Sequence, residues 1–306
     1  MSSYFMTTKY YKQDNIKFNK EFAHRLKRLY PAYILLIIVA SLLYIIVKSQ
    51  FPCDIPIFLF SGQNFFWILG NMFDWGSPLS GILAHTWYIT LDVYLFILWI
   101  LVIKYAQENR LRVICYAGIV TAVAWRVMCN LLFDDKAISY TIPIGQLDSY
   151  CIGALIALNK TSDFKSKFHA TINIGTGLIL IIMCVLFVSY TRDLNFIQSY
   201  QFFAKSSNYT HNPILVNIYL FSAILFAGIL QLCLQVGKNS ILCKSWMVTL
   251  GNWSYELYLF HFPFIWILSR FITTPYLMII IALPLTLLSA YIWHRYVEGH
   301  IQTLIN

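Results

Sequence analysis

Charged residues are scarce in this sequence and make up only 11% of its 306 residues. Soluble domains carry roughly 25% charged residues, and so few charges cannot cover a water-facing surface. An ordinary soluble enzyme is therefore excluded. Intrinsic disorder is excluded too, because 17% of the residues are aromatic and 59% are apolar.

Several common catalytic and metal-binding patterns are also missing. No two of the seven cysteines have CxxC spacing, and most fall in apolar stretches, so we expect neither a disulfide framework nor a zinc site. The sequence contains no HExxH, no GxSxG and no phosphate-binding glycine loop. The first 28 residues lack the apolar core of a cleavable signal peptide. No internal repeat or separate soluble domain is visible.

Long apolar runs are what the sequence has in place of charge. A bilayer span takes about 20 residues, and nine candidates occur, at 31–47, 55–71, 85–105, 112–132, 143–159, 170–190, 214–236, 249–270 and 275–296. The run 55–71 is the weakest, because it holds several polar residues. We predict an all-α polytopic transmembrane bundle of about eight spans plus one interfacial or re-entrant segment. Residues 1–28 form a basic cytoplasmic segment and 29–300 the transmembrane domain.

The net charge of +9 supports this topology. If 55–71 does not cross and the N-terminus is cytoplasmic, 16 Lys and Arg residues lie inside and 5 outside. If 55–71 crosses, the division is 11 against 10. Cytoplasmic loops carry the excess of Lys and Arg, so the first topology is favoured, with both termini cytoplasmic. The basic charge then reports orientation, and no nucleic-acid partner is expected.

Ionisable residues inside the predicted spans are the first pointers to function. A charge at the centre of a span costs about 2.5–3.5 kcal/mol, so such residues face the bundle interior or a water-filled cavity. They are Asp92, Arg126, Asp148, Glu256 and His261. For Asp148 two interpretations stay open, a structural pair with Arg126 or a role in substrate binding.

A second pointer is the spacing of His85 and Asp92, which are seven residues apart and share one face of a helix, beside Trp87. A histidine and a carboxylate that line a cavity can transfer protons. Alternatively, Asp92 forms a buried ion pair with Arg126, and His85 is an interface residue.

Residues 250–264 hold the densest polar cluster in any predicted span. Ser254, Tyr258 and His261 recur at helical spacing and form a polar stripe, which faces protein or water rather than lipid.

A basic cluster precedes the first span. It consists of Arg25, Lys27 and Arg28. These cations either anchor the chain at lipid headgroups or bind a phosphorylated cytoplasmic ligand.

Four stretches together resemble the acyltransferase 3 family, the integral-membrane O-acyltransferases of bacteria. They are FAHRLKRLYPAY, HTWYITLDVYLFILW, GQLDSYCIGALIAL and LGNWSYELYLFHFPF. The last is the most specific, since it matches the S-Y-x-x-Y-L-x-H-x-P pattern of the family from Ser254 to Pro263. The resemblance implies ten spans, acyl-CoA (typically acetyl-CoA) on the cytoplasmic side, and a hydroxyl of a lipid-linked or surface glycan as acceptor.

The sequence also departs from the family pattern. Asp92 stands where the family usually has Glu, and Tyr88 where it has Ser. Nothing matches the Arg and the presumed catalytic His of the family's first span. With eight spans predicted, we expect that the first two spans of the family are lacking.

These residues and the resemblance together predict a multi-pass O-acyltransferase of the bacterial inner membrane, in contact with membrane lipids and requiring no metal. The predicted catalytic residues are His261, His85 and Asp92. The predicted substrate-binding residues are Trp87, Arg126, Asp148, Ser254, Tyr258 and Glu256. The acyl-CoA would dock near Arg25, Lys27 and Arg28. Two alternatives stay open: a transporter or flippase that uses the same charges as a proton relay, and a non-catalytic or truncated relative.

Overall fold

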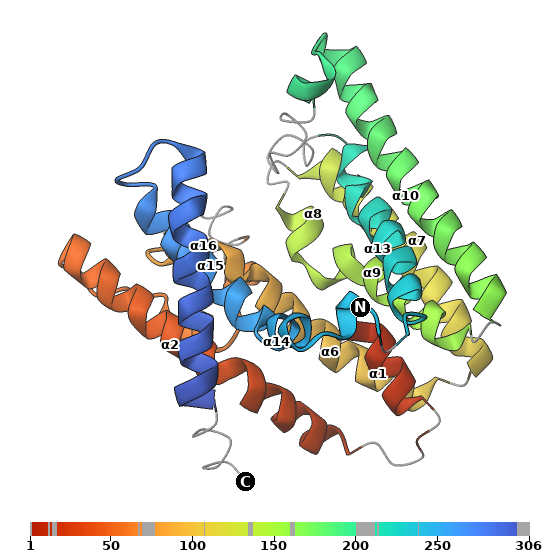
Figure 1. Cartoon of the computed structure of the whole chain (residues 1–306), viewed down its shortest axis with the longest axis horizontal. Coiled ribbons are helices and arrows are strands. Elements are labelled where there is room, and N and C mark those ends of the chain that lie inside the picture. The colour runs from red at the N-terminus through yellow and green to blue at the C-terminus, as the bar shows by residue number, and fades with distance from the viewer. Residues whose placement is uncertain are drawn as a thin grey trace. The chain divides into compact units, whose positions relative to one another are not determined.

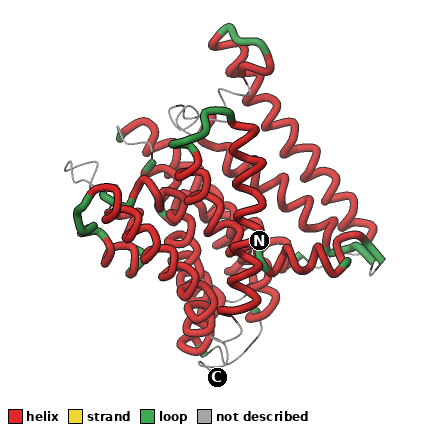
Figure 2. The backbone as a smooth tube through the Cα atoms, turned by 60° about the vertical axis from the view of Figure 1, so that its left-hand side comes forward, coloured by secondary structure: helices red, strands yellow, loops and turns green. Residues whose placement is uncertain are grey.

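The computed structural model describes residues 2–11, 13, 17–66, 68, 77–106, 108–133, 137–159, 163–199, 212, 214–237 and 239–298. Every regular element in these ranges is a helix, as the tube in Figure 2 shows, which confirms the predicted all-α class. The chain forms two compact units, and the predicted division into a cytoplasmic segment 1–28 and a transmembrane domain 29–300 stays a prediction. Unit 1 comprises Met1–Ile16 and Leu91–Gly237, and unit 2 comprises Lys17–Thr90 and Lys238–Asn306.

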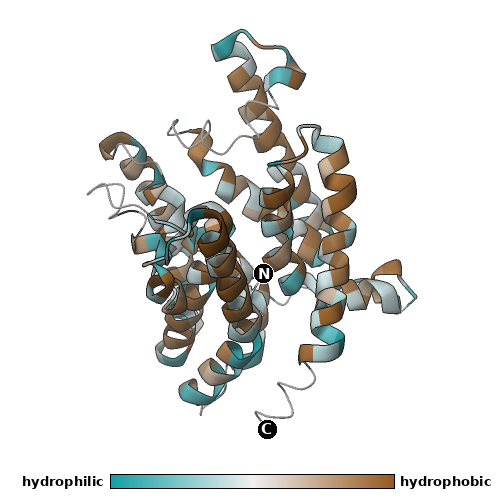
Figure 3. Cartoon of the chain, turned by 90° about the vertical axis from the view of Figure 1, so that its left-hand side faces the viewer, coloured by the Kyte–Doolittle hydropathy of each residue, from teal (hydrophilic) through white to brown (hydrophobic). Residues whose placement is uncertain are grey.

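Six helical stretches among the described residues are long and apolar enough to cross a bilayer. They are Phe18–Lys48, Ser80–Tyr105, Asn109–Leu132, Lys167–Arg192, Leu215–Cys233 and Pro275–Glu298. Each coincides with a predicted span, and hydrophobic residues, brown in Figure 3, predominate along the long helices. Many of these apolar side chains are exposed, Ile46 at 76% and Tyr276 at 78% for example. Exposure on this scale is typical of a surface that faces lipid rather than water.

Two predicted spans are shorter than expected. The run 143–159 corresponds to an apolar helical stretch, Pro143–Leu158, that is shorter than the six. The run 249–270 was predicted as one span. The structure divides it at Trp253 into α14 (Ser245–Asn252) and α15 (Ser254–Leu268). The poor helix formers Gly251 and Asn252 precede the interruption. The 15 residues of α15 rise about 22 Å, which is less than the roughly 30 Å of a hydrocarbon core.

The weak run 55–71 contains no helix of spanning length among its described residues, which end at 66 and 68. It begins with the five-residue helix α3 (Ile55–Leu59). The chain then turns at Ser61, whose φ of 52° lies in the left-handed region. Just before α3, the buried carboxylate of Asp54 links this run to the segment that precedes α5 (Ser80–Leu83). Its Oδ2 accepts hydrogen bonds from the Ser77 hydroxyl (2.8 Å) and the Leu79 N–H (3.0 Å).

Unit 1 is built from a short N-terminal helix, red in Figure 1, and a bundle that runs there from yellow through green to cyan. Its elements are α1 (Ser2–Tyr10), α6 (Trp87–Tyr105) from Leu91 on, α7 (Glu108–Leu132), α8 (Ile138–Thr141), η2 (Pro143–Gln146), α9 (Leu147–Leu158), α10 (Asp163–Arg192), η3 (Leu215–Asn217) and α13 (Ile218–Cys233). The helix α1 packs on α9, and Trp99 Nε1 donates to Thr7 Oγ1 at 3.0 Å. The long pair α10 and α13 approaches closely at two glycines, because a Cβ on Gly177 or Gly228 would fall within 2.7 Å of the opposite helix.

Unit 2 contains the rest of the chain. Its elements are α2 (Phe18–Lys48), α3, α5 (Ser80–Leu83), η1 (Ala84–Thr86), the first four residues of α6, η4 (Ile241–Cys243), α14, α15, α16 (Pro275–Ile292) and η5 (Trp293–Glu298). Its core gathers apolar residues of α2, α5 and α15 around Tyr33, Leu83 and Leu259. The helix α15 packs against α2, α5 and α16, so its residues are held from several sides.

Candidate active site

The site begins with a proline in the middle of α15. Pro263 has no N–H, so it cannot donate the usual helical hydrogen bond to the carbonyl of Leu259, four residues earlier. That carbonyl instead accepts a hydrogen bond from Nε2 of His85 at 3.0 Å. The proline of the S-Y-x-x-Y-L-x-H-x-P pattern therefore leaves a backbone carbonyl without its helical donor. A histidine from another part of unit 2 donates to that carbonyl instead.

This hydrogen bond decides the tautomer of His85. A carbonyl can only accept, so the proton of the neutral ring is on Nε2, and Nδ1 carries the lone pair. Nδ1 is buried and has no hydrogen-bond partner among the described residues. His85 as a whole is 8% exposed. The result is a basic nitrogen that is fixed in orientation and not used by the fold.

Aromatic rings surround His85. The ring of Phe262 stacks on it at 4.9 Å between centroids with an interplanar angle of 29°. The rings of His261 and Tyr258 meet it edge-on, each at 5.5 Å. We call these four residues the histidine cluster, and all of them belong to unit 2.

His261 and Tyr258 are fixed in turn by backbone carbonyls. Nδ1 of His261 donates to the Tyr258 carbonyl at 2.6 Å, which leaves Nε2 of His261 as its basic nitrogen. The hydroxyl of Tyr258 donates to the backbone carbonyl of His85. Two of the three members of the predicted polar stripe therefore contact His85. The third, Ser254, is exposed at the first residue of α15 and lies outside the histidine cluster.

Two amide side chains that the sequence reasoning did not single out fix the backbone around His85. Nε2 of Gln63 donates to the carbonyl of Thr86 and to the hydroxyl of Tyr33, both at 3.1 Å. Nδ2 of Asn64 donates to the carbonyl of Trp87 at 2.9 Å. A signal for this role existed, because two adjacent amides in an apolar run are costly unless they are hydrogen-bonded.

The seven-residue spacing predicted that His85 and Asp92 share one face of an α-helix. The structure shows that they do not lie on one regular α-helix. His85 lies in the 3₁₀ turn η1, and α6 begins after it at Trp87. Asp92 is half-buried on α6 and belongs to unit 1. Its catalytic role stays a prediction, as does substrate binding by the half-buried Trp87.

The predicted donor-binding cations lie on α2, where Arg25 is half-buried and Lys27 and Arg28 are exposed. In the same unit, the hydroxyl of Tyr255 donates to the Leu29 carbonyl at 2.8 Å and holds the start of α15 against this part of α2.

Glu256 lies one residue further along α15. Its side chain is 5% exposed, and Oε2 has no hydrogen-bond partner among the described residues. Electrostatic interactions link this carboxylate to Arg28 and to His294. His294 also pairs with Glu298 at 2.5 Å, within the π-helical turn η5.

Arg126 and Asp148 form a separate arrangement in unit 1. Both side chains are fully buried, and Nη2 of Arg126 contacts Oδ2 of Asp148 at 2.6 Å. The same guanidinium donates to the Gly145 carbonyl (2.6 Å) and to Oδ1 of Asn217 (3.3 Å). Of the carboxylates weighed as partners of Arg126, the structure pairs it with Asp148. The guanidinium links α7, η2, α9 and η3, so its donors are occupied by the fold.

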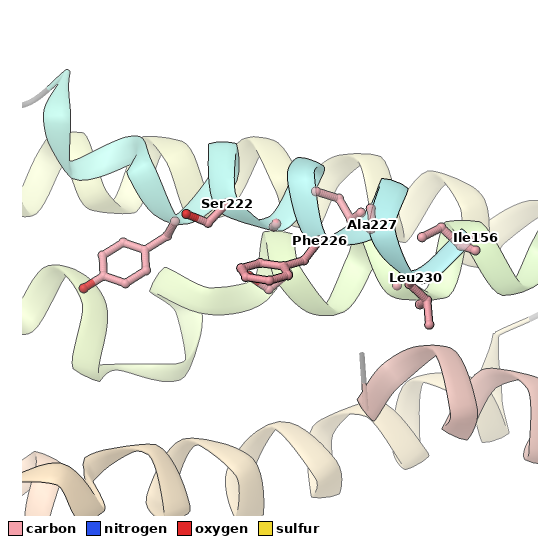
Figure 4. Close-up of a pocket in the computed structure, with 10 residues that line it drawn as sticks. Ile156, Ser222, Phe226, Ala227 and Leu230 are labelled. Atoms are coloured by element: carbon pink, nitrogen blue, oxygen red, sulfur yellow. The ribbon is translucent and has the colours of Figure 1, made fainter. Parts of the chain in front are cut away.

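A cavity of unit 1 has a volume of about 460 Å³ and lies between α9 and α13. Figure 4 shows Ile156, Phe226, Ala227 and Leu230 on its walls, with the hydroxyl of Ser222 at one end. It contains none of the predicted catalytic residues. No group of three or more metal-ligating residues occurs in the described ranges.

These observations define a class: a polytopic helical membrane protein in which a buried histidine, His85, meets a half-buried one, His261, and the Nδ1 of His85 is not used by the fold among the described residues. The chain belongs to the acyltransferase 3 family, since the family model described as "Acyltransferase domain" matches residues 1–295. The resemblance seen in the four sequence stretches is thereby confirmed.

Curated relatives support the same family. The chain is 22% identical over 328 residues to "O-acetyltransferase OatA" of Staphylococcus aureus strain NCTC 8325 / PS 47, and equally to that of strains COL and MRSA252. The match covers 99% of this chain and 51% of the relative, so the chain spans about half the length of the curated relatives it matches. No solved structure matches it.

Proposed function

We propose that the protein is a membrane O-acyltransferase that moves an acyl group, acetyl in the first instance, from acyl-CoA to a hydroxyl of a cell-envelope glycan. The observation that carries the proposal is Nδ1 of His85, a buried basic nitrogen without a hydrogen-bond partner among the described residues. The family supports the reaction type. The name of the relative, an O-acetyltransferase, supports acetyl as the group transferred.

His85 serves as general base in this proposal. Its Nδ1 takes the proton of the acceptor hydroxyl while the oxygen attacks the thioester carbonyl carbon. A C–O bond forms and the C–S bond breaks. The thiolate leaves and receives the proton back from Nδ1, so the products are an O-ester and free CoA. Nε2 keeps its own proton throughout, on the Leu259 carbonyl.

His261 has the second basic nitrogen of the histidine cluster, Nε2. With its ring 5.5 Å from that of His85, it can hydrogen-bond the incoming hydroxyl or share the proton. Phe262 covers one face of His85 and keeps water from it. In a site that excludes water, an activated hydroxyl attacks the thioester in preference to water.

The donor would bind through its phosphates at Arg25, Lys27 and Arg28, since Arg pairs well with phosphate. These cations and the histidine cluster belong to one unit, joined by α2 and α15. From Ser254 to His261 the helix α15 rises about 10 Å, so a donor anchored near its start would need an extended arm to bring the thioester to the histidines.

The proposal is tested on membranes that contain the full chain, supplied with acetyl-CoA and cell-wall glycan. Free CoA is measured with a thiol reagent, and ester-linked acetyl groups are measured on the glycan. A general base contributes about 10²- to 10⁴-fold, so we expect His85→Ala to reduce both signals by that factor. His261→Ala should reduce them less, because the first base remains.

The matched control is His169→Ala, which removes an exposed histidine of unit 1 and should leave both signals unchanged. Full activity of the double variant His85→Ala, His261→Ala would refute the assigned roles. A stably inserted wild-type chain without turnover on any acyl-CoA or glycan would identify it as a non-catalytic relative.

A further inference from the structure

A groove in unit 2 lies away from the histidine cluster, at the far ends of α2 and α15. Its volume is about 360 Å³. The lining consists of Leu43, Tyr44, Val47, Lys48, Pro78, Gly81, Ile82, Trp266, Ile267, Arg270 and Phe271. Nearly all of it is apolar, and it contains no carboxylate. Its outer residues are open to the surroundings, Phe271 with 82% of its surface exposed.

Two cations lie on this groove. Lys48 is the last residue of α2, and Arg270 follows the end of α15. Both are exposed, and neither takes part in an ion pair within the described ranges. The guanidinium of Arg270 lies over the ring of Trp266, 4.7 Å from its centroid, which holds the charge beside the groove.

The chemistry of the groove is that of an amphiphile with a negative head. Two of its apolar walls belong to stretches that are long and apolar enough to cross a bilayer, Phe18–Lys48 and Ser80–Tyr105, and hydrocarbon rather than water covers such surfaces in a membrane. Lys48 ends α2 and Arg270 follows α15, so both cations lie at the ends of apolar helices, where lipid headgroups are expected. Basic residues at that depth attract anionic lipids, with a contribution of about 1 kcal/mol each. A cation that only anchored a helix end at the membrane surface would not require an apolar groove beside it.

We propose that this groove is a binding site for an anionic phospholipid, with an acyl chain along the apolar walls and the phosphate between Lys48 and Arg270. Nε1 of Trp266, beside Gly81 in the wall of the groove, is an additional donor. The site is separate from the histidine cluster and is independent of the acyl-transfer reaction.

Gly81 offers a way to block the groove without touching its charges. A Cβ on Gly81 would lie 3.5 Å from Nε1 of Trp266, which is an ordinary contact. Alanine therefore fits, whereas the ring of phenylalanine would occupy the space of the acyl chain. Gly81→Ala and Gly81→Phe form a matched pair.

The experiment is native mass spectrometry of the full chain in detergent, with phosphatidylglycerol and phosphatidylcholine of identical acyl chains added in turn. We expect the wild type to retain phosphatidylglycerol about 10- to 30-fold better, as two headgroup cations imply. Lys48→Gln with Arg270→Gln should abolish this preference. Gly81→Phe should reduce retention of both lipids, whereas Gly81→Ala and Arg192→Gln should behave as wild type.

Equal retention of the two lipids by the wild type would overturn the proposal. So would an undiminished preference in the double variant. Competition by millimolar inorganic phosphate would overturn it as well, by assigning the cations to a free anion. If Gly81→Phe fails to insert, the double variant still decides, because its two substitutions change only exposed side chains.

Discussion

At the scale of single residues, the site depends on an unused backbone acceptor. In α15, Pro263 frees the Leu259 carbonyl, and His85 occupies it through Nε2. The proton position on an imidazole is set by the hydrogen bond that its other nitrogen makes. In the proposed reaction the proline is therefore a positioning residue, because it sets the proton position on His85 without touching a substrate.

Replacing Pro263 tests this link. In Pro263→Ala the new N–H competes for the Leu259 carbonyl, so His85 loses its fixed tautomer. We expect acyl transfer to fall about 10-fold or more and its pH profile to change, while thermal stability is unchanged or higher, since an interior proline costs about 3 kcal/mol. Pro284→Ala is the matched control, because it also restores a helical N–H, in α16 of the same unit. An equal loss in both variants would point to general helix distortion instead.

In the proposed reaction Gln63 is a second positioning residue, because it donates to the Thr86 carbonyl next to His85. Gln63→Leu keeps the side-chain size but loses the bonds to Thr86 and Tyr33. Small misplacements of a catalytic group cost up to about 100-fold, so we expect a 10- to 100-fold lower kcat with little change in KM for acetyl-CoA. A loss confined to KM, or none beyond that of the exposed control Gln198→Leu, would contradict this role.

The sequence located polar residues inside the spans more readily than it identified their partners, and the catalytic roles of these residues stay predictions. His85, Tyr258 and His261 were recognisable because titratable and polar groups are costly in a span. The partner of Arg126 was not, because Asp92 and Asp148 were both plausible, and spacing along the chain does not decide between helices. The role of Gln63 depends on a hydrogen bond to a residue 23 positions away. Two amides in an apolar run indicate that partners exist but do not identify them.

At the scale of elements, the Arg126–Asp148 pair joins α7, η2, α9 and η3. A role of this pair in substrate binding can be separated from its structural role by mutation. Loss of one partner of a buried pair typically costs 3–5 kcal/mol, whereas an apolar replacement of both is often neutral. We expect Arg126→Met alone to destabilise the chain by about that amount. Arg126→Met with Asp148→Leu should recover both thermal stability and acyl transfer. A double variant that is stable but inactive would instead assign the pair to substrate binding.

The close approach of α10 and α13 makes a second prediction about elements. A Cβ on Gly177 would meet Leu225 at 2.7 Å, whereas one on Gly175, in the same helix, has nothing within 4 Å. Overpacking costs about 1–3 kcal/mol, so Gly177→Ala should lower the melting temperature measured in detergent. Gly175→Ala, the matched control, should leave it unchanged or raise it, since alanine favours a helix. Equal melting temperatures would mean that the two helices are not in close contact.

Apolar runs located the elements well, but their continuity was less predictable. Six predicted spans correspond to helical stretches of sufficient length among the described residues. The interruption at Trp253 was missed, because an apolar count over 249–270 is insensitive to a turn of backbone. Non-helical backbone at membrane depth is tolerated where protein or a water-filled cavity surrounds it, which is the situation expected near a site that must admit a polar acceptor.

At the scale of the whole molecule, unit 2 provides an argument about topology that does not depend on counting charges. The starts of the apolar parts of α2 and α15 meet, through Tyr255 and Leu29. Their ends, near Lys48 and Arg270, line one groove. The two helices therefore run in the same direction. If both cross, an odd number of spans separates them. Five predicted spans lie between them when 55–71 does not cross, and six when it does.

This parity predicts the side on which each marker is accessible. With the N-terminus cytoplasmic, cysteines introduced at Lys48 and Arg270 should react with a membrane-impermeant maleimide from outside intact cells. Cysteines at Lys27 and Arg295 should react only after the membrane is opened. Wild-type labelling provides the background of the seven natural cysteines. If α2 and α15 run in the same direction, Lys48→Cys and Arg270→Cys must be labelled from the same side. Labelling of these two variants from opposite sides would restore 55–71 as a span and place α15 antiparallel to α2.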